Sequence, residues 1–266
     1  MPELAEVEYY RKQWDTGVGE RIRAVAVHPD KRIFRECNAA QLVTELEGRS
    51  LCGSLTHGKQ MLFEFSDGAW LRLRLGMTGN LYAANKDYEP SKHDHLVFEC
   101  DSVALIFNDS RQFGSCRLHI GKELPSWWSS LPPQILDPRF TLEHCREALR
   151  RRSRSPLKSI LLDQSWFPGI GNWMADEILW RAALHPALLG GSIRGSALKS
   201  LFNKTIEVAR DALEVIGTDW GTPPTSWLFP HRWNDGGICP STGEPLVRET
   251  IGGRTTCYCP TLQTLP

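Results

Sequence analysis

The residues with the clearest potential for chemistry stand at the N-terminus, in the sequence Met1-Pro2-Glu3-Leu4. Met1 precedes a small residue, so its removal would leave Pro2 with a free secondary amine. Such an amine is more nucleophilic than a lysine amine, and the positive end of a helix dipole disfavours its protonated form. A neutral amine can attack a sugar C1′ and form a Schiff base. Glu3 and Glu6 offer nearby carboxylates for proton transfer, although an ordinary helix with proline at its first position has the same pattern.

A second group of residues, 163–172, indicates a helix, a glycine turn and a new helix. Gly169 and Gly171 would let the backbone approach a phosphate, and we expect Asn172 to cap the helix that follows. Unpaired N–H groups at a helix start bind anions. The pattern resembles a helix–two-turn–helix DNA-binding motif, and a plain helical hairpin is the alternative.

The tail contains a third group, with the spacing of a two-stranded zinc finger. Cys239 and Cys259 stand at two of the four ligand places, but the other two hold Thr242 and Leu262. A structural zinc needs four good ligands, so we expect no bound zinc and a hairpin held by packing. Cys257 stays open as a third thiolate, because it would share a strand face with Cys259. A further ligand outside the frame, such as a histidine of the tail, also stays open.

The elements that must position these residues follow from the hydrophobic periodicity. Residues 3–14 and four later segments, 142–150, 157–163, 172–183 and 197–215, have helical spacing. Short β-rich runs predict strands at 22–27, 60–65, 70–75, 96–99 and 103–107. In the run 70–75, leucines alternate with Arg72 and Arg74, which is typical of a half-buried strand. The segment 127–139 is rich in proline, serine and tryptophan and indicates a linker.

The bulk composition limits the class of protein. The chain has 266 residues, with 31 basic and 31 acidic side chains, so its net charge gives no support for nucleic-acid binding, although a neutral total can hide a basic face. The arginine-rich run 146–158 is either such a face or an ordinary solvated surface. No apolar run is long enough to span a membrane, and the N-terminus shows no secretion signal. We therefore expect a cytoplasmic protein whose eight cysteines are reduced thiols.

Five motifs together resemble a known family. They are MPELAEVE at 1–8, LRLGMTGNL at 73–81, NDSRQFG at 108–114, FPGIGNWMADEILWRAALHP at 167–186 and GGRTT at 252–256. In this order they resemble the formamidopyrimidine-DNA glycosylase and endonuclease VIII family, and they span nearly the whole chain. The leucine after Glu3 is typical of the formamidopyrimidine side of that family.

The resemblance implies a role for each matching residue. Pro2 would be the nucleophile, Glu3 the acid–base carboxylate that protonates the opening deoxyribose, and Glu6 an assistant to it. Lys59 would reach a phosphate next to the lesion from a β-turn.

On the DNA side, Asn172 and Arg254 would complete the clamp on the backbone, with Gly171 allowing close approach. Met77, Arg111 and Phe113 match the three side chains that fill the space left by the everted base. Taken singly, the same residues also fit a core methionine, a surface arginine and a core ring.

The implied fold is α+β. An N-terminal helix and β-sandwich at 1–130 would be followed by a linker at 131–140, a helix–two-turn–helix domain at 141–225, and a recognition segment with a zincless β-hairpin finger at 226–266. Damaged double-stranded DNA would bind in the cleft between the two domains. The protein would act as a monomer without a cofactor, and it would be associated with the nucleoid in a bacterium.

The implied reaction is base excision repair by a bifunctional glycosylase and AP lyase. It would excise oxidised purines, 8-oxoguanine or formamidopyrimidines, through a Pro2 Schiff base followed by β- and δ-elimination. Alternatives are the same fold acting on oxidised pyrimidines, or a non-catalytic protein that binds damaged DNA. The sequence departs from the family at Ser110, at Gln112 and in the tryptophan-rich segment 219–233, which resembles that of zincless plant and fungal members.

Overall fold

The computed structural model describes residues 1–265 and divides into two compact units. The first unit contains Met1–Pro2 and Glu6–Leu131, and the second contains Glu3–Ala5 together with the chain from Pro132 onward. The chain boundary between the units therefore falls at the start of the expected linker. The finer division of the second half at residue 225 stays a prediction.

The first unit is a β-sandwich preceded by a helix. Its helices are α1 (Leu4–Lys12, whose first two residues belong to the second unit), α2 (Ala39–Leu46) and α3 (Ser126–Ser129), with short 3-10 turns at Asp15–Gly17 and Arg32–Phe34. Its strands are β1 (Ile22–Val27), β2 (Leu51–His57), β3 (Gln60–Phe65), β4 (Ala69–Arg74), β5 (Asn80–Asn85), β6 (Asp94–Cys100), β7 (Val103–Asn108) and β8 (Ser115–Ile120).

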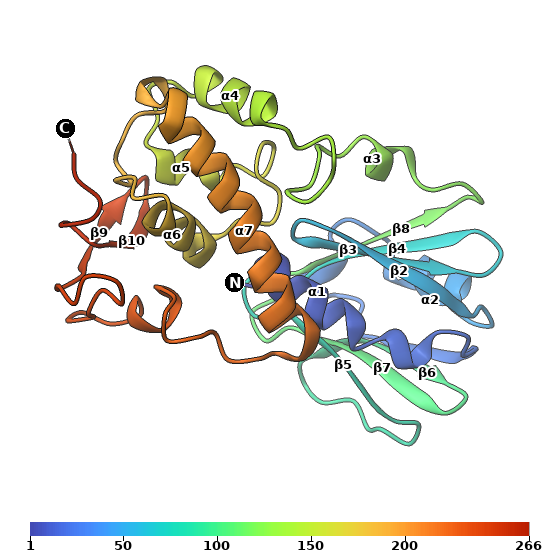
Figure 1. Cartoon of the computed structure of the whole chain (residues 1–266). Coiled ribbons are helices and arrows are strands. Elements are labelled where there is room, and N and C mark those ends of the chain that lie inside the picture. Colours follow the sequence, from blue (N-terminus) through green and yellow to red (C-terminus); the bar gives the residue numbers. More distant parts are fainter. Residues whose placement is uncertain (266) are drawn as a thin grey trace. The chain divides into compact units, whose positions relative to one another are not determined.

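Two antiparallel sheets form this sandwich, in the orders β2-β3-β4-β8 and β1-β6-β7-β5 (Figure 1). Buried apolar residues from both sheets form one shared core. Trp14, after α1, lies in this core with its ring 4.6 Å from that of Phe63 in one sheet and 5.4 Å from that of Phe98 in the other. The expected β-rich domain with one leading helix is thus confirmed.

In β4, leucines alternate with arginines, but the strand is not half-buried as this pattern predicted. Arg72 is buried, not solvated, because it forms a 2.8 Å ion pair with Glu36 and a 3.1 Å hydrogen bond to Ser115. A buried arginine requires such partners. Both faces of β4 are therefore covered, and only Arg74 at its end is exposed.

A buried carboxylate fixes the outer face of the second sheet. Asp94 accepts hydrogen bonds from Tyr82 and Asn108, both at 2.8 Å, and from Tyr88 at 2.7 Å. Burial raises the pKa of Asp94, but hydrogen bonds from Asn108, Ser91 and Tyr88 lower it more, to about 2.

We expect Asp94→Asn to lower the free energy of unfolding by about 2 kcal/mol at neutral pH. Because the folded-state pKa is depressed, this stabilisation is full above the unfolded-state value and is lost as the pH falls towards about 2. Urea unfolding at pH 7 and at pH 3 measures the difference, with the exposed Asp87→Asn as the control. An equal loss at both pH values would contradict the assignment.

The second unit is helical and ends in a hairpin. Its helices are α4 (Leu142–Arg151), α5 (Leu157–Leu161), α6 (Asn172–Arg181) and α7 (Gly195–Asp219), with 3-10 turns at Gly190–Ser192 and Phe229–His231. The hairpin strands are β9 (Val247–Ile251) and β10 (Arg254–Tyr258). These elements lie close to the expected ones, so the predicted α+β architecture is confirmed.

A helix with almost every side chain buried is the centre of this unit. Residues Trp173 to Trp180 of α6 are all buried, against α4, α5 and α7 on one side and against the hairpin on the other. Such complete burial makes α6 the element to which the surrounding segments are fixed.

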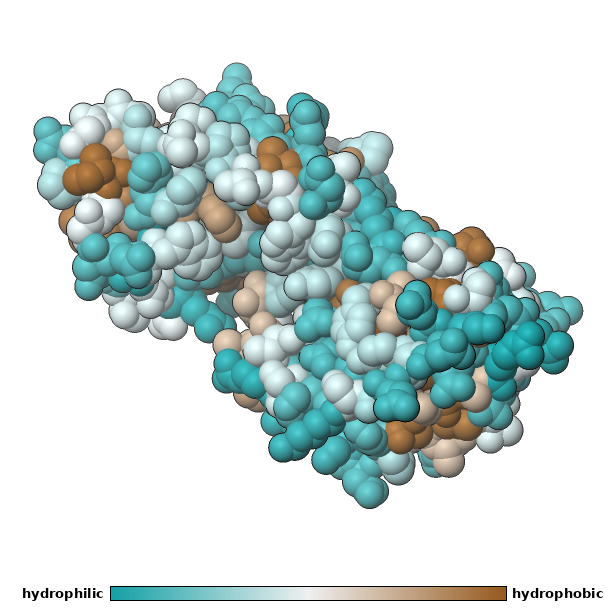
Figure 2. Space-filling model, turned by 90° about the horizontal axis from the view of Figure 1, so that it is seen from below, coloured by the Kyte–Doolittle hydropathy of each residue, from teal (hydrophilic) through white to brown (hydrophobic). Residues whose placement is uncertain are grey.

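The face of the molecule shown in Figure 2 is predominantly hydrophilic. On the face in Figure 2, hydrophobic residues form small separate groups among polar ones. No helix among the described residues combines the length and the apolar composition needed to cross a membrane.

Candidate active site

The carboxylate of Glu3 is bound by the N-terminus of α6. Its Oε2 accepts hydrogen bonds from the backbone N–H groups of Gly171 at 2.9 Å and Met174 at 3.1 Å, and its Oε1 accepts one from Trp173 at 3.0 Å. The N–H of Leu4 donates to the carbonyl of Gly169 at 3.0 Å. Together these bonds hold the residue after Pro2 in one position.

This arrangement corrects the expected role of Asn172. The helix begins at Asn172, and its N-cap residue is Gly171, which has no side chain to cap it. The N–H groups that we expected to bind an external anion are instead satisfied by Glu3, which occupies the positive end of the α6 dipole. Asn172 points elsewhere, and its Nδ2 donates to the carbonyl of Thr255 at 2.9 Å.

Residue 171 must be glycine because there is no room for a Cβ, and not because of its φ angle. Its φ of −123° is accessible to any residue. A Cβ built there, however, would overlap the carboxylate of Glu3. Glu3 is only 3% exposed, so it has little room to move aside. The structure thus places Gly171 in the cradle of the carboxylate, and its close approach to DNA stays a prediction.

The other residues expected to take part in catalysis are at least partly accessible. Pro2, which lies two residues before α1, and Glu6, in the first turn of α1, are both half-buried. Lys59 is half-buried in the turn between β2 and β3, after Gly58, whose φ of +56° favours glycine. This position on a tight turn agrees with the one expected from the family, and the role of Lys59 stays a prediction.

The three side chains expected to fill the base-pair gap lie on adjacent loops of the first unit. Met77 is 45% exposed and Phe113 is 37% exposed, so neither is a core residue. The guanidinium of Arg111 lies 4.8 Å from the centre of the Phe113 ring. A Cβ on Gly76 would overlap the backbone of Phe113, so the loop carrying Met77 packs closely against the other loop. These solvent-facing apolar side chains fit insertion into a base stack.

Asp109 organises these loops, a role that the sequence reasoning missed. It is fully buried, and its carboxylate accepts hydrogen bonds from the Thr78 hydroxyl and the Gly114 N–H, both at 2.7 Å. The bonds connect the Met77 loop with the Phe113 loop. The signal available in the sequence was the run Asn108-Asp109-Ser110, because short polar side chains bond nearby backbone groups in loops.

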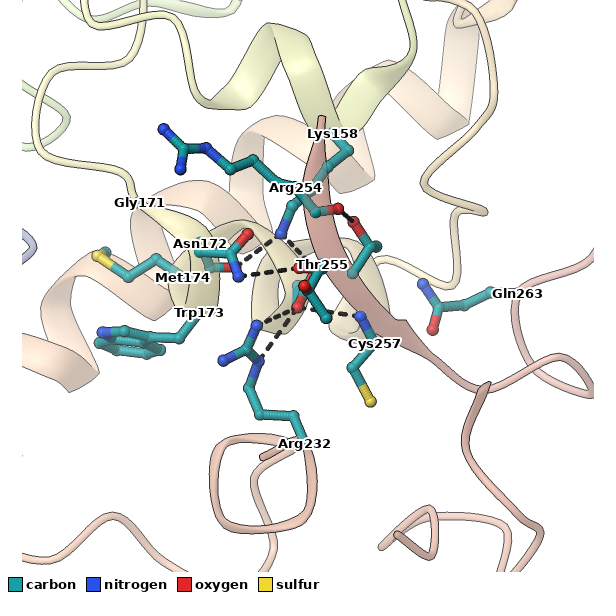
Figure 3. A network of polar contacts seen from close by, with 12 residues as sticks. Lys158, Gly171, Asn172, Trp173, Met174, Arg232, Arg254, Thr255, Cys257 and Gln263 are labelled. Atoms are coloured by element: carbon teal, nitrogen blue, oxygen red, sulfur yellow. Dashed lines mark hydrogen bonds and ion pairs between the residues drawn. The ribbon is translucent and has the colours of Figure 1, made fainter. Parts of the chain in front are cut away.

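Arg254 stands at the start of β10, directly after the Gly252-Gly253 turn, and is exposed. Figure 3 shows its guanidinium extending away from the polar contacts around α6. An amide nitrogen carries two hydrogens, so the contact of Asn172 with Thr255 leaves one for a phosphate oxygen. The contacts of Arg254 and Asn172 with a DNA backbone stay predictions.

The residues at the zinc-finger positions do not fit a zinc ion. The Thr242 hydroxyl lies 3.4 Å from the Cys259 sulfur, and the Trp180 indole donates to the Cys239 sulfur at 3.3 Å. Burial raises the pKa of Cys239, but hydrogen bonds from Ser241, Thr242 and Trp180 lower it more, to about 6. Protein donors thus surround the sulfur where a metal would bind.

The other ligands that the sequence left open are also engaged. The Cys257 side chain lies in the apolar cluster around Trp180, and burial raises its pKa to about 11. The Nε2 of His231 lies 2.8 Å from the carbonyl oxygen of Thr225. Among the described residues, no three histidine, cysteine or acidic side chains gather as a metal site. Instead, Leu246 and Leu262 pack with Trp180 and the cysteines in one apolar cluster.

We expect elemental analysis of the purified protein to find substoichiometric zinc. Chelator treatment should leave activity unchanged, because the apolar cluster around Trp180 and not a metal closes the hairpin. One zinc per chain, with activity lost on chelation, would show that this expectation is wrong.

The arginine-rich run is mostly internally paired. Arg146 pairs with Glu143, and Arg150 and Arg151 both pair with Glu147, at 2.6 and 2.7 Å. Neighbouring carboxylates repel phosphates, so the structure favours an ordinary solvated face. Lys158 does not belong to this face at all, because its side chain is fully buried.

The tryptophan-rich segment after α7 is fixed in place. Trp227 is buried beneath Arg181, 4.9 Å from its guanidinium, and the N–H of Phe229 donates to Glu177 at 3.0 Å. Trp233 is exposed and packs edge-on against the Phe229 ring at 5.1 Å. The segment thus docks on α6 and is not a free loop.

Comparison with known proteins defines the class. Residues 1–116 match the model of the formamidopyrimidine-DNA glycosylase N-terminal domain, and residues 131–222 match that of its H2TH domain. A solved structure of Lactococcus lactis Fpg (MutM) with DNA containing an oxidised pyrimidine is similar over 99% of this chain and 100% of that chain, with a TM-score of 0.89 and 28% identity. The fold is that of a DNA glycosylase with an H2TH domain.

Similar whole sequences identify the family. A formamidopyrimidine-DNA glycosylase of Exiguobacterium sibiricum is 33% identical and covers 99% of each chain. One of Arabidopsis thaliana is 31% identical over 100% of this chain and 71% of its own length. The chain belongs to the formamidopyrimidine-DNA glycosylase family, a family of DNA-repair enzymes, and the resemblance seen in the motifs is confirmed.

Proposed function

We propose that the protein is a bifunctional DNA glycosylase and AP lyase that excises oxidised bases through a Schiff base on Pro2. The observation that carries this proposal is the immobilised Glu3 carboxylate, held by three backbone N–H groups directly after Pro2 in the chain. A nucleophilic amine next to a fixed proton acceptor is the arrangement that amine catalysis requires. A protein that only binds DNA needs neither group.

The reaction begins once Met1 has been removed. The neutral amine of Pro2 attacks C1′, and the bond between C1′ and the base breaks, with its electron pair leaving on the base. The attacking nitrogen then loses its proton to the Glu3 carboxylate. Glu3 returns that proton to O4′ as the sugar ring opens, which gives an iminium ion between Pro2 and C1′.

Strand cleavage follows from the iminium ion, which acidifies the C2′ protons. Removal of one C2′ proton expels the 3′-phosphate by β-elimination. A further proton loss expels the 5′-phosphate by δ-elimination, and water then hydrolyses the imine to regenerate Pro2. Glu6, half-buried one turn along α1, assists these proton transfers.

DNA is held by two sets of residues. Lys59, Asn172 and Arg254 contact phosphates around the lesion, where cationic and amide donors position the backbone without reading sequence. Met77, Arg111 and Phe113 fill the stack after the damaged nucleotide is everted, with Arg111 bonded to the orphaned base. The protein acts on double-stranded DNA as a single copy of this chain.

The preferred substrate class is oxidised purine, meaning 8-oxoguanine or a formamidopyrimidine. The names of the relatives support this choice, since both are called formamidopyrimidine-DNA glycosylase. Activity on oxidised pyrimidines is the second candidate, because the similar Lactococcus lactis structure contains DNA with such a base.

Borohydride trapping tests the proposal. The protein is incubated with duplexes that carry 8-oxoguanine, an oxidised pyrimidine or no damage, and sodium borohydride reduces any Schiff base. We expect a one-to-one covalent adduct, formed faster on 8-oxoguanine than on the pyrimidine and absent from the undamaged duplex. Tight binding to damaged DNA without any adduct would instead identify a non-catalytic binding protein.

A further inference from the structure

One buried carboxylate connects the finger hairpin to the helical unit. Asp176 of α6 is 1% exposed, and its Oδ2 accepts hydrogen bonds from Arg232 Nη2 at 2.5 Å and from the Cys257 N–H at 3.1 Å. Figure 3 shows Arg232 and Cys257 with dashed lines that converge on this point. Its Oδ1 forms an ion pair with Lys158 at 2.5 Å. The carboxylate thus joins α5, α6, β10 and the segment before the hairpin.

Burying the charges of this cluster costs free energy, so they must be paired with one another. Lys158 and Asp176 have fully buried side chains, and that of Arg232 is only 4% exposed. Breaking a buried pair by removing one partner costs far more than breaking a surface pair. The cluster is consequently a firm attachment point and not a solvated contact.

Two contacts fix the register of β10 along α6. Asn172 and Asp176 are one helical turn apart and lie on the same face of α6. They bond the carbonyl of Thr255 and the N–H of Cys257, which are alternate residues of β10. Arg254 immediately precedes this pair of contacts, so its position along the helix is set by them.

A third contact fixes the turn that carries Arg254. A Cβ on Gly252 would overlap the hydroxyl of Ser159, so the turn packs closely on α5 beside Lys158. The hairpin is therefore held at its tip and along one strand by α5 and α6. The four positions of a zinc-finger frame, two of which have lost their ligands, contribute only packing and hydrogen bonds.

We propose that Arg232 is a positioning residue that, through its ion pair with Asp176, holds β10 so that Arg254 meets a DNA phosphate. The ion pair does the anchoring that a metal would otherwise provide. This inference rests on the proposed function for its DNA contact, while the anchoring itself is independent of activity. Arg232 acts through Arg254 and touches neither the DNA nor the reacting atoms.

The first test compares Arg232→Met with a control from the same region. Arg248→Met removes another arginine of the hairpin. Its ion-pair partner Asp235 is 90% exposed, so loss of that ion pair should have little effect on stability. The readout is the dissociation constant for a duplex with a tetrahydrofuran abasic analogue, measured over a range of salt. We expect about 10-fold weaker binding for Arg232→Met, with the salt slope reduced by about one phosphate contact, and no change for Arg248→Met.

A double-mutant cycle separates positioning from a general loss of structure. If Arg232 acts through Arg254, then Arg232→Met combined with Arg254→Ala should bind within about 2-fold of the weaker single variant. Additive losses, giving about 100-fold weaker binding, would overturn the proposal. The rate of adduct formation at saturating DNA should stay near the wild-type rate in Arg232→Met, and Arg232→Lys should recover part of the binding. Loss of that rate together with binding would indicate a merely structural role.

Hydrogen exchange in the free protein tests, without DNA, whether the ion pair of Arg232 and Asp176 holds β10 on α6. The Cys257 amide, which donates to Asp176, should exchange at least about 10-fold faster in Arg232→Met than in the wild type, and no faster in Arg248→Met. An unchanged exchange rate at Cys257 would show that Arg232 does not hold β10 in position. Failure of the wild-type protein to prefer damaged over intact duplex would sink the proposed function alone, since the exchange result would stand.

Discussion

Gly171→Ala should slow base removal severely while leaving the protein folded. The added methyl group would occupy the space of the Glu3 carboxylate and expel it from the N-terminus of α6. The φ of residue 171 is accessible to alanine, so the helix itself should form normally. Because a positioned proton-transfer group contributes about 100-fold to 10,000-fold in rate, we expect at least about 100-fold slower excision.

Single-turnover excision from an 8-oxoguanine duplex measures this effect. Gly53→Ala is the matched control, because its Cβ would meet no atom within 4 Å. Glu3→Gln should lose excision to a similar degree and keep its affinity for DNA, since the carboxylate is needed for proton transfer and not for holding phosphate. The double variant with Gly171→Ala should then show no further loss. Wild-type excision by Gly171→Ala would contradict the role assigned to the cradle.

The sequence predicted the regular elements where local signals were strong. The strands 22–27 and 60–65 agree with β1 and β3 at both ends, because each is a run of apolar and β-branched or aromatic residues. The strands β2, β5 and β8, LCGSLTH, NLYAAN and SCRLHI, were missed. They are rich in small and polar residues, and pairing with neighbours decides their conformation more than local propensity does.

The cradle of Glu3 was beyond local reasoning for a different reason. The sequence correctly indicated an anion site at the start of α6, but it could not name the anion. The carboxylate that occupies the site is 168 residues away from Gly171 in the chain. Only tertiary structure brings the two together, so a general rule about helix ends gave the right chemistry and the wrong occupant.

The second kind of error in the sequence predictions concerns the burial of charged residues. Arg72 and Lys158 were interpreted as surface residues, yet both are buried with carboxylate partners. A charged residue in a run of charged residues is usually exposed to solvent. It becomes buried only when the fold brings a partner of opposite charge to it from elsewhere in the chain. In this protein such partners mark the places where separate segments are attached to one another.

Retention of Met1 should remove all Schiff-base chemistry. With Met1 in place the nitrogen of Pro2 is an amide, whose lone pair is delocalised and which cannot attack C1′. Protein prepared without methionine removal should therefore bind damaged DNA and give no borohydride adduct. Intact-mass measurement of both preparations establishes which N-terminus each carries before the reaction is started.

The same experiment distinguishes Pro2 from a lysine nucleophile. Lys59 is a half-buried amine expected near the lesion, so Lys59→Ala in the trimmed protein is the matched control. If Pro2 is the nucleophile, Lys59→Ala should still form the adduct at saturating DNA, although it binds DNA more weakly because it lacks a phosphate contact. Peptide mapping of the reduced adduct should place the sugar on Pro2. An adduct on the chain that retains Met1, mapped to Lys59, would transfer the covalent role to that lysine and leave Glu3 with a different proton to move.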